Sequence, residues 1–338
     1  MFEQEGMPQL QAVLSTPKNI VITTHRKPDG DAMGSMLAMY LYLKKKHHHV
    51  TAISPTDYPD FLAWMPSHKD VLRYDTQEIT CRKAIDKADL VICLDFNKLY
   101  RLEKLGDVIA ASKADKVCID HHLEPDDFAR YRYIHTKACS TCELVYEFIK
   151  LMEDENYLDT DIATCIYTGI MTDTDNFRIP TTSHKVFLIA ADLVEHGVLP
   201  SFVYDKVFLS FTHSRLSFFG YVISERLEVL PEYHTAIISL DADDLKKFKI
   251  GTGDTEGVVN LPMQIADVRL TIMIVQRKDE VKISMRSKGN INVNDICRQH
   301  FNGGGHANAS GGSSSRNVAE TVTFAKSLLP QYKTILNA

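Results

Sequence analysis

The chain has 338 residues, 44% of them hydrophobic and 24% charged, which fits a globular protein of two ordinary domains and excludes a disordered one. No apolar run approaches the roughly 20 residues that cross a bilayer, which excludes a membrane-spanning protein. A formal net charge of −6 argues against a broad basic face for long duplex nucleic acid and favours short nucleotides held by a few local cations.

The first half of the chain alternates short apolar runs with amphipathic helical patterns. Strands are predicted at residues 19–24, 50–54, 90–94, 116–119 and 131–135. Helices are predicted at residues 32–46, 141–152, 161–171 and 183–196. This alternation is typical of a mainly parallel sheet wrapped by helices.

The second half begins with a helical pattern at residues 199–227 and then returns to strands. Strands are predicted at residues 235–240, 269–276 and 281–286, the last two forming a hairpin that turns at Lys278-Asp279. A final helix is predicted at residues 317–329. We therefore predict an α/β domain over residues 1–196, a helical connector over 197–230 and a smaller α/β domain over 231–338.

Carboxylate and imidazole side chains follow three of the predicted strands. They are His25, Asp29 and Asp31 after the first strand, Asp95 after residues 90–94, and Asp120-His121-His122 after residues 116–119. A further aspartate, Asp173, lies at the end of a predicted helix. Parallel α/β sheets place their sites at the C-terminal ends of their strands, where these groups would repel each other without a cation. The sequence therefore predicts a metal site.

Each of these signatures alone has a structural alternative. Asp29 and Asp31 could satisfy backbone amides in a turn at Gly30, and the adjacent histidines could lie in a surface loop. Asp95 could cap a short helix, although an aspartate directly after five apolar residues is costly to bury unless it is paired or metal-bound. Asp175 lies two residues beyond Asp173 and competes with it for the same role.

The seven cysteines, an odd number scattered along the chain, indicate free thiols in a reducing compartment. We therefore predict a cytoplasmic protein. Cys139-Ser140-Thr141-Cys142 is a single CxxC without a second copy, and it lies where a helix is expected to begin. We interpret it as helix capping and small-residue packing instead of a redox or zinc site.

In this order and with these spacings, the four signatures resemble the DHH phosphoesterase superfamily. Further motifs that look like the DHH-associated C-terminal domain are Asp254-Thr255-Glu256-Gly257, Ser284-Met285-Arg286-Ser287 and Phe301-Asn302-Gly303-Gly304-Gly305-His306. Within the superfamily, the chain is similar to the oligoribonuclease and 3′-phosphoadenosine 5′-phosphate (pAp) phosphatase branch, often called nanoRNase A. The resemblance covers nearly the whole chain.

The resemblance implies a site for two manganese ions, with other divalent ions allowed. His25, Asp29 and Asp95 would hold one ion, and Asp31, Asp95, His121 and Asp173 would hold the other, with Asp95 bridging. His122 would face the substrate phosphate, and Asp120 would orient the histidines. Mixed imidazole and carboxylate ligands suit manganese better than magnesium.

Additional positive charge for a phosphate must come from elsewhere, because four aspartates leave two divalent ions nearly neutralised. The candidates are Arg178, His122, Arg286 and His306. The run Gly303-Gly304-Gly305 predicts a binding loop whose amides approach a phosphate closely. A surface arginine and a flexible glycine loop are the structural alternatives.

The implied activity is metal-dependent hydrolysis of phosphate esters in the cleft between two domains, with 3′-to-5′ release of mononucleotides from short RNAs, conversion of pAp to AMP, or both. Linear or cyclic dinucleotides such as pApA are alternative substrates. A manganese pyrophosphatase would lack the Gly-Gly-Gly-His motif, and a non-catalytic RNA-binding module would have broken metal signatures. Neither long duplexes nor membranes are expected partners, and the sequence leaves open a homodimer.

Overall fold

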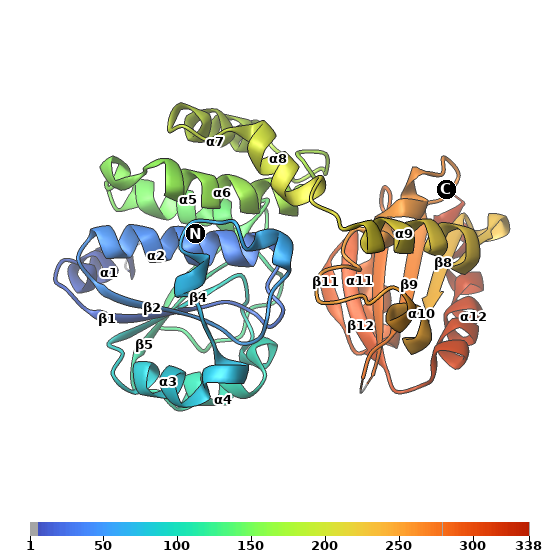
Figure 1. Cartoon of the computed structure of the whole chain (residues 1–338), viewed down its shortest axis with the longest axis horizontal. Coiled ribbons are helices and arrows are strands. Elements are labelled where there is room, and N and C mark those ends of the chain that lie inside the picture. Colours follow the sequence, from blue (N-terminus) through green and yellow to red (C-terminus); the bar gives the residue numbers. More distant parts are fainter. Residues whose placement is uncertain (1–5, 279, 338) are drawn as a thin grey trace. The chain divides into compact units, whose positions relative to one another are not determined.

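The structure is a computed structural model in which residues 6–278 and 280–337 are described (Figure 1). The chain divides into two compact units, the first ending at Ser210 and the second beginning at Phe211. Both units combine helices with a sheet, which confirms the predicted α/β fold. The boundary falls between helices α8 (Pro200–Phe208) and α9 (His213–Tyr221), inside the segment predicted as a connector.

Six parallel strands form the sheet of the first unit, in the order β3-β2-β1-β4-β5-β6. Their bounds are β1 (Asn19–Thr23), β2 (His49–Ser54), β3 (Leu72–Arg73), β4 (Leu90–Leu94), β5 (Asp115–Asp120) and β6 (Tyr131–Ile134). Every residue of β4 is buried, as expected for a strand with helices on both faces. The chain adds strands outward from β1 to β3 and then returns to β4, so the direction of winding changes between β1 and β4.

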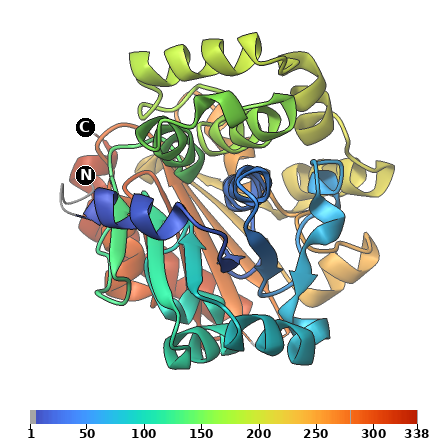
Figure 2. The same ribbon diagram turned by 90° about the vertical axis from the view of Figure 1, so that its left-hand side faces the viewer.

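Helices cover both faces of this sheet (Figures 1 and 2). One core cluster includes buried side chains of α1, α2, α5, α6, α7 and α8, and another includes those of α3 and α4. The bounds are α1 (Gly6–Leu14), α2 (Gly30–Lys45), α3 (Tyr74–Asp86), α4 (Lys104–Ala111), α5 (Thr141–Leu151), α6 (Thr160–Asp173) and α7 (His184–Glu195). The four helices predicted in this unit are present, whereas α1, α3, α4 and the two-residue β3 lie where no element was predicted.

Glycines allow α2, α5 and α6 to pack closely. A Cβ atom at Gly34 of α2 would lie 2.5 Å from the backbone oxygen of Cys165 in α6. A Cβ atom at Gly169 of α6 would lie 2.2 Å from Cys142 Sγ and 2.8 Å from Asp31 Oδ1. Both separations are far below a normal van der Waals contact, so these positions require glycine. The close packing brings the start of α2 near α6, and both helices carry candidate ligands.

The second unit contains a mixed sheet in the order β11-β12-β10-β9-β8-β7. Its strands are β7 (Leu227–Leu230), β8 (Thr235–Leu240), β9 (Leu270–Gln276), β10 (Val281–Ser287), β11 (Gly304–His306) and β12 (Ala309–Ser314). Its helices besides α9 are α10 (Ala242–Lys247), α11 (Val293–His300) and α12 (Val318–Leu336). The predicted hairpin is present as antiparallel β9 and β10, and Asp279 of its predicted turn lies outside the described residues.

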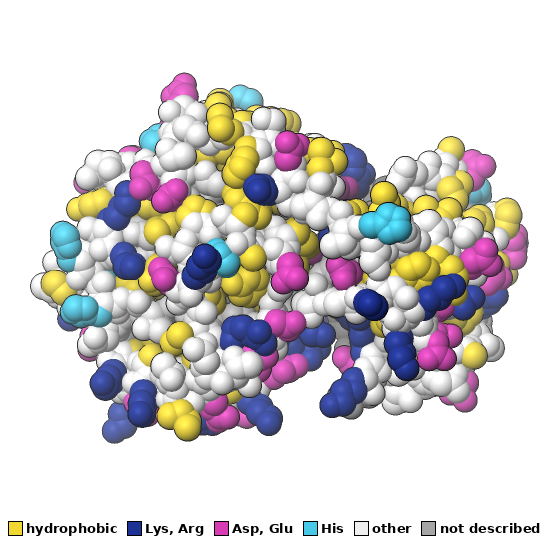
Figure 3. All heavy atoms as spheres, in the orientation of Figure 1, with side chains coloured by type: hydrophobic (Ala, Val, Ile, Leu, Met, Phe, Trp, Pro, Cys, Tyr) yellow, Lys and Arg dark blue, Asp and Glu magenta, His cyan; other side chains and the backbone are white. Residues whose placement is uncertain are grey.

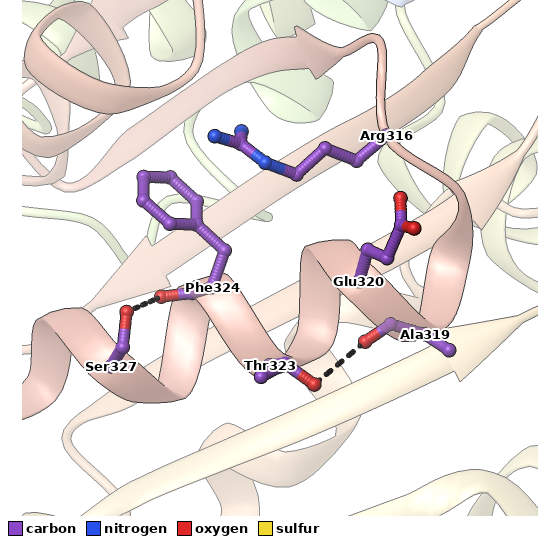
Figure 4. Close-up of a pocket in the computed structure, with 6 residues that line it drawn as sticks. All are labelled: Arg316, Ala319, Glu320, Thr323, Phe324 and Ser327. Atoms are coloured by element: carbon purple, nitrogen blue, oxygen red, sulfur yellow. Dashed lines mark hydrogen bonds between the residues drawn. The ribbon is translucent and has the colours of Figure 1, made fainter.

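Buried side chains of β9 and β10 pack with α11 and α12 on one face of this sheet, while Phe218 and Phe219 of α9 pack with β8 and β9 in a separate cluster. A shallow depression of about 530 Å³ along α12 is lined by Arg316, Ala319, Glu320, Thr323, Phe324 and Ser327 (Figure 4). In it the Arg316 guanidinium lies 4.2 Å from the centroid of the Phe324 ring. The depression contains none of the predicted site residues.

Within the described residues, no single helix is long and apolar enough to cross a membrane. One helix pair, α7 and α8, meets the length and composition criteria together, but it is bent by 106°.

Candidate metal centre

Three neighbouring strands bring the candidate ligands together at the C-terminal end of the first sheet. His25 lies two residues after β1, Asp95 directly follows β4, and His121 directly follows β5. Because these strands are parallel and adjacent, their C-terminal ends meet. Asp29 caps the N-terminus of α2, and α6 ends at Asp173.

His25, Asp29 and Asp95 form a first group of close ligand atoms. His25 Nε2 lies 3.2 Å from Asp95 Oδ2 and 3.9 Å from Asp29 Oδ2. His25 Nδ1 lies 2.8 Å from the backbone oxygen of Arg26. A carbonyl oxygen only accepts hydrogen bonds, so Nδ1 carries the proton and Nε2 is the atom turned toward the carboxylates.

Asp31, His121 and Asp173 form a second group. His121 Nε2 lies 3.4 Å from Asp173 Oδ2 and 3.8 Å from Asp31 Oδ2. His121 Nδ1 lies 3.2 Å from the backbone oxygen of Ala138, which fixes the same tautomer as in His25.

Asp95 reaches both groups through its two carboxylate oxygens. Oδ2 faces His25, while Oδ1 lies 3.6 Å from His121 Nε2. The backbone of Asp95 has a φ of 64°, a left-handed conformation that aspartate tolerates better than most residues. The short helix that follows, Leu99–Leu102, has Lys98 at its N-cap, so Asp95 does not cap it. A carboxylate with one oxygen toward each ligand group is the arrangement expected of a bridging ligand.

The N-terminus of α5 fixes the carboxylate of Asp31. The backbone amides of Thr141 and Cys142 donate to its two oxygens at 2.7 and 2.8 Å, and the Thr141 hydroxyl donates to Asp95 Oδ1 at 3.0 Å. Ser140 caps α5, which confirms the capping interpretation of the CxxC segment. Sequence reasoning missed Thr141 as a site residue, since an amide donor at a helix start has no side-chain signature.

Asp120 orients the neighbouring His122. Asp120 Oδ1 lies 2.8 Å from His122 Nδ1, and Asp120 Oδ2 accepts from the His122 amide at 3.1 Å. A buried carboxylate here makes Nδ1 the protonated ring atom. His122 Nδ1 also lies 3.7 Å from Asp95 Oδ1, so His122 is beside the two ligand groups.

Arg178 forms an ion pair with Asp175. Its Nε donates to Asp175 Oδ2 at 2.8 Å, and its side chain is 68% exposed. Asp175, Asn176 and Phe177 have φ angles of 49°, 57° and 62°, so three consecutive non-glycine residues turn the chain sharply after α6. Among the described residues, the groups of close ligand atoms include Asp173 and not Asp175.

In the second unit, Arg286 and His306 flank Ala309 on one face of the sheet. Arg286 of β10 pairs with Ala309 of β12, and Ala309 pairs with His306 of β11, so the three side chains project on the same side. Gly304 and Gly305 belong to a short strand, where sequence analysis predicted a loop. Gly303, directly before this strand, must be glycine, because a Cβ atom there would lie 2.0 Å from the backbone oxygen of Gly311.

Comparison with known proteins covers both units. Residues 19–170 match the DHH family, N-terminal domain, and residues 233–331 match the DHHA1 domain. The crystal structure of an exopolyphosphatase-related protein from Bacteroides fragilis is 38% identical, with a TM-score of 0.94 over 100% of this chain and 99% of that one. The chain belongs to the DHH family. The resemblance seen in the sequence is therefore confirmed.

Two curated DHH relatives illustrate the range of the family. The bifunctional oligoribonuclease and PAP phosphatase NrnA of Bacillus subtilis (strain 168) is 26% identical over 309 residues, which are 90% of this chain and 92% of the relative. The cyclic-di-AMP phosphodiesterase PdeA of Listeria monocytogenes serotype 1/2a (strain 10403S) is 24% identical over 311 residues, 88% of this chain and 45% of the relative.

The DHH centre concentrates negative charge in a buried place. Asp31 and Asp95 are only 1% and 2% exposed. Burial and then the charge of Asp95 raise the pKa of Asp31 well above its usual value, and burial raises the pKa of Asp173 to about 6 although His121 opposes it. Burial alone would lower the pKa of His121, but Asp173, Asp31 and Asp95 raise it to about 9. The carboxylates therefore need added positive charge, from protons or from a metal ion.

The donor set of this DHH centre fits divalent cations. Around an octahedral ion with bonds of about 2.1 Å, neighbouring ligand atoms lie roughly 3 Å apart and opposite ones roughly 4 Å apart. The imidazole–carboxylate distances of 3.2 to 3.9 Å in the two groups fall in that range. A divalent cation between the groups would replace the proton on Nε2 of His25 and of His121, while Nδ1 of each ring keeps the proton that it donates to a backbone oxygen.

Proposed function

We propose that this chain is a manganese-dependent phosphoesterase that hydrolyses short oligoribonucleotides, pAp, or both. The observation that carries the proposal is the pair of imidazole–carboxylate groups, each built around a buried histidine, that share Asp95, one oxygen of which faces each group. In this proposal His25, Asp29 and Asp95 hold one ion, and Asp31, Asp95, His121 and Asp173 hold the other. Two such ions supply positive charge that polarises a phosphoryl group and lowers the pKa of water.

Manganese is proposed over magnesium because two of the ligands are imidazoles. Magnesium favours oxygen ligands and retains several waters, whereas manganese accepts mixed nitrogen and oxygen sets. The fixed tautomers of His25 and His121 present nitrogen atoms to both ions.

The phosphate itself is proposed to contact His122, whose ring is held by Asp120 through Nδ1 so that Nε2 is the contacting atom. Arg286 and His306 would bind a second phosphate or a base, with Ala309 leaving space between the two side chains. The amides of Gly303 and Gly305 already donate to the Cys297 backbone oxygen and to Asn294 Oδ1, at 3.2 and 2.9 Å, so these two amides are not proposed as phosphate ligands. Arg178 would reach a phosphate only after its ion pair with Asp175 opens, so its part in binding is secondary.

The named relatives support two substrate classes. An oligoribonuclease and PAP phosphatase matches over 92% of its length, and a cyclic-di-AMP phosphodiesterase matches over 45% of its length. Linear or cyclic dinucleotides are therefore the second candidate substrates. A non-catalytic RNA-binding module has less support, since the predicted ligand atoms lie within 4.8 Å of one another in each group.

A substrate panel tests the proposal. Protein stripped of metal and reloaded with manganese should release AMP from pAp and mononucleotides from a dinucleotide and a trinucleotide RNA, followed by chromatography. We expect kcat/KM on a long RNA duplex to be at least about tenfold lower, because the chain carries a net charge of −6 and offers few cations to a long backbone.

The panel includes pyrophosphate, polyphosphate and cyclic-di-AMP as competing substrates. Equal rates on the dinucleotide and the long duplex would contradict the size preference. Faster turnover of pyrophosphate or polyphosphate than of every nucleotide would contradict the nucleotide assignment, and full activity in a chelator would contradict the metal requirement.

We also propose a homodimer, with a second copy packed on the apolar side chains of α7 and α8. Large side chains there are 42 to 67% exposed, namely Phe187, Leu188, Val194, Leu199, Phe202 and Leu209. Figure 3 shows hydrophobic atoms gathered over these helices. Together they expose on the order of 600 Å², close to the roughly 800 Å² that each partner contributes to a standard interface.

Replacing Leu188 by glutamate should convert a dimer to monomers in sedimentation experiments, because an interface core excludes an unpaired charge. Exposed Ile79, on α3, provides the control substitution Ile79→Glu, which should leave the mass unchanged. A wild-type monomer at all concentrations, or a dimer that persists in Leu188→Glu, would contradict this arrangement.

The state of the cysteines bears on the compartment in which the protein acts. All seven are buried and free. Thiols persist where the surroundings are reducing, so we propose that the protein acts in the cytoplasm.

A further inference from the structure

Arg101 is anchored beside the candidate metal centre. It lies in the short helix Leu99–Leu102 that follows β4, and its backbone oxygen accepts from the Arg26 amide at 2.9 Å. Its Nη1 donates to the backbone oxygen of Asp95 at 3.4 Å. The backbone of Arg101 is therefore tied to the loop that carries His25, and its guanidinium is tied to the residue that joins the two ligand groups.

Arg101 differs from other cations near this edge in its partners. Arg26 pairs with Glu103, Arg178 pairs with Asp175, and Lys98 lies 4.0 Å from Asp126. The side chain of Arg101 instead bonds to a backbone oxygen, and in the described part of the chain no carboxylate lies within ion-pair distance of it. A guanidinium has five N–H donors in a planar fork, and a single backbone contact leaves most of them unused.

Once metal ions have neutralised the carboxylates of the centre, the charge of Arg101 is left without a compensating anion. Arg101 is half-buried, and its guanidinium is bonded to the backbone of the proposed shared ligand Asp95. A fixed cation so close to a metal ligand opposes the binding of a divalent ion. A phosphate bound at the same edge would compensate both positive charges, and a guanidinium matches phosphate oxygens in charge and shape.

We propose that Arg101 binds a non-bridging oxygen of the substrate phosphate at the edge where the loops after β1 and β4 meet. The inference rests on the proposed phosphoesterase function and adds to it a substrate-binding residue of the first unit. Sequence analysis assigned that role to Arg178, whose guanidinium is more exposed and already paired with Asp175.

The test compares Arg101→Ala and Arg101→Lys with Arg26→Ala, in manganese-loaded full-length protein. Arg26 is the matched control because it carries the same charge, adjoins His25 and is paired with Glu103. For Arg101→Ala we expect kcat/KM on pAp to fall about thirtyfold, the value of a charge-assisted hydrogen bond. Arg101→Lys should recover part of this loss, and Arg26→Ala should change it less than about threefold.

Manganese content by elemental analysis should be unchanged in all three variants. Loss of metal in Arg101→Ala would overturn the proposal and place Arg101 in the support of the metal ligands. Equal losses of kcat/KM in Arg101→Ala and Arg26→Ala would mean that either positive charge merely attracts the substrate, and would also overturn the proposal.

A second arm separates this inference from the proposed function. Binding of inorganic phosphate to the manganese-loaded protein, measured by calorimetry, should weaken about tenfold in Arg101→Ala and stay near wild type in Arg26→Ala. This arm requires no turnover. If no nucleotide were hydrolysed but phosphate binding fell as expected, the proposed function would fail and the role of Arg101 would stand. Unchanged phosphate binding in Arg101→Ala would refute that role.

Discussion

Replacing Asp95 by asparagine is expected to lower kcat/KM on pAp about a thousandfold, equivalent to about 4 kcal/mol, and to reduce the manganese bound per chain. Asp95 is the residue whose two oxygens face both ligand groups, and an amide replaces one of those oxygens with a nitrogen that has no lone pair to offer. Asparagine also tolerates the left-handed backbone at this position, where φ is 64°. Loss of activity should therefore reflect the lost carboxylate and not a refolded loop.

The measurements are steady-state kinetics and elemental analysis of the purified variant. Asp107, an exposed aspartate of α4, provides the control Asp107→Asn, which should match the wild type in both. Near-normal activity and metal content in Asp95→Asn would show that the two ligand groups do not act as one centre.

Replacing Gly169 by alanine is expected to lower the free energy of unfolding of the first unit by about 1–3 kcal/mol, the usual cost of overpacking. The new methyl group would lie 2.2 Å from Cys142 Sγ and 2.9 Å from Cys142 Cβ, both in the core between α5 and α6. It would also lie 2.8 Å from Asp31 Oδ1, so the variant should bind manganese more weakly as well. Urea unfolding followed by fluorescence would report on this unit, because Trp64 is the one tryptophan of the chain.

A double-mutant cycle identifies the clash. Cys142→Ala removes the sulfur atom. The double variant Gly169→Ala, Cys142→Ala should therefore lose less free energy of unfolding than the two single variants lose when their losses are added. A Cβ atom at Gly6 of α1 would meet no other atom within 4 Å, which makes Gly6→Ala the control with little or no loss. Additive effects of the two core substitutions would mean that the sulfur is not what opposes a side chain at Gly169.

The ligands were predictable from sequence because their signals are local. A run of buried residues such as Leu90–Leu94 marks an interior strand, and the polar residue that ends it must have a reason to be there. Asp95 and His121 follow this rule. Parallel pairing then brings the two residues together, since adjacent parallel strands have their C-terminal ends at the same end of the sheet.

Features that depend on contacts across the fold were missed. Thr141 acts through an amide and a hydroxyl, and Arg101 lies six residues beyond Asp95 in a short helix with no distinctive pattern. The ion pair between Arg178 and Asp175 depends on three consecutive left-handed residues that non-glycine sequences rarely adopt. A binding loop was predicted at Gly304 and Gly305 because a histidine follows three glycines, yet pairing with β12 makes these two residues part of a strand.

The position of β4 between β1 and β5 has a further consequence for how the centre behaves over time. An interior strand has backbone hydrogen bonds on both sides, so its amide hydrogens exchange with solvent only when a large part of the unit opens. Edge strands such as β3 and β6 can fray alone at much lower cost. Asp95 is thus attached to the slowest-opening part of the first sheet. An ion held there would leave by exchanging ligands with water, and not through local unfolding of the strand that presents its shared ligand.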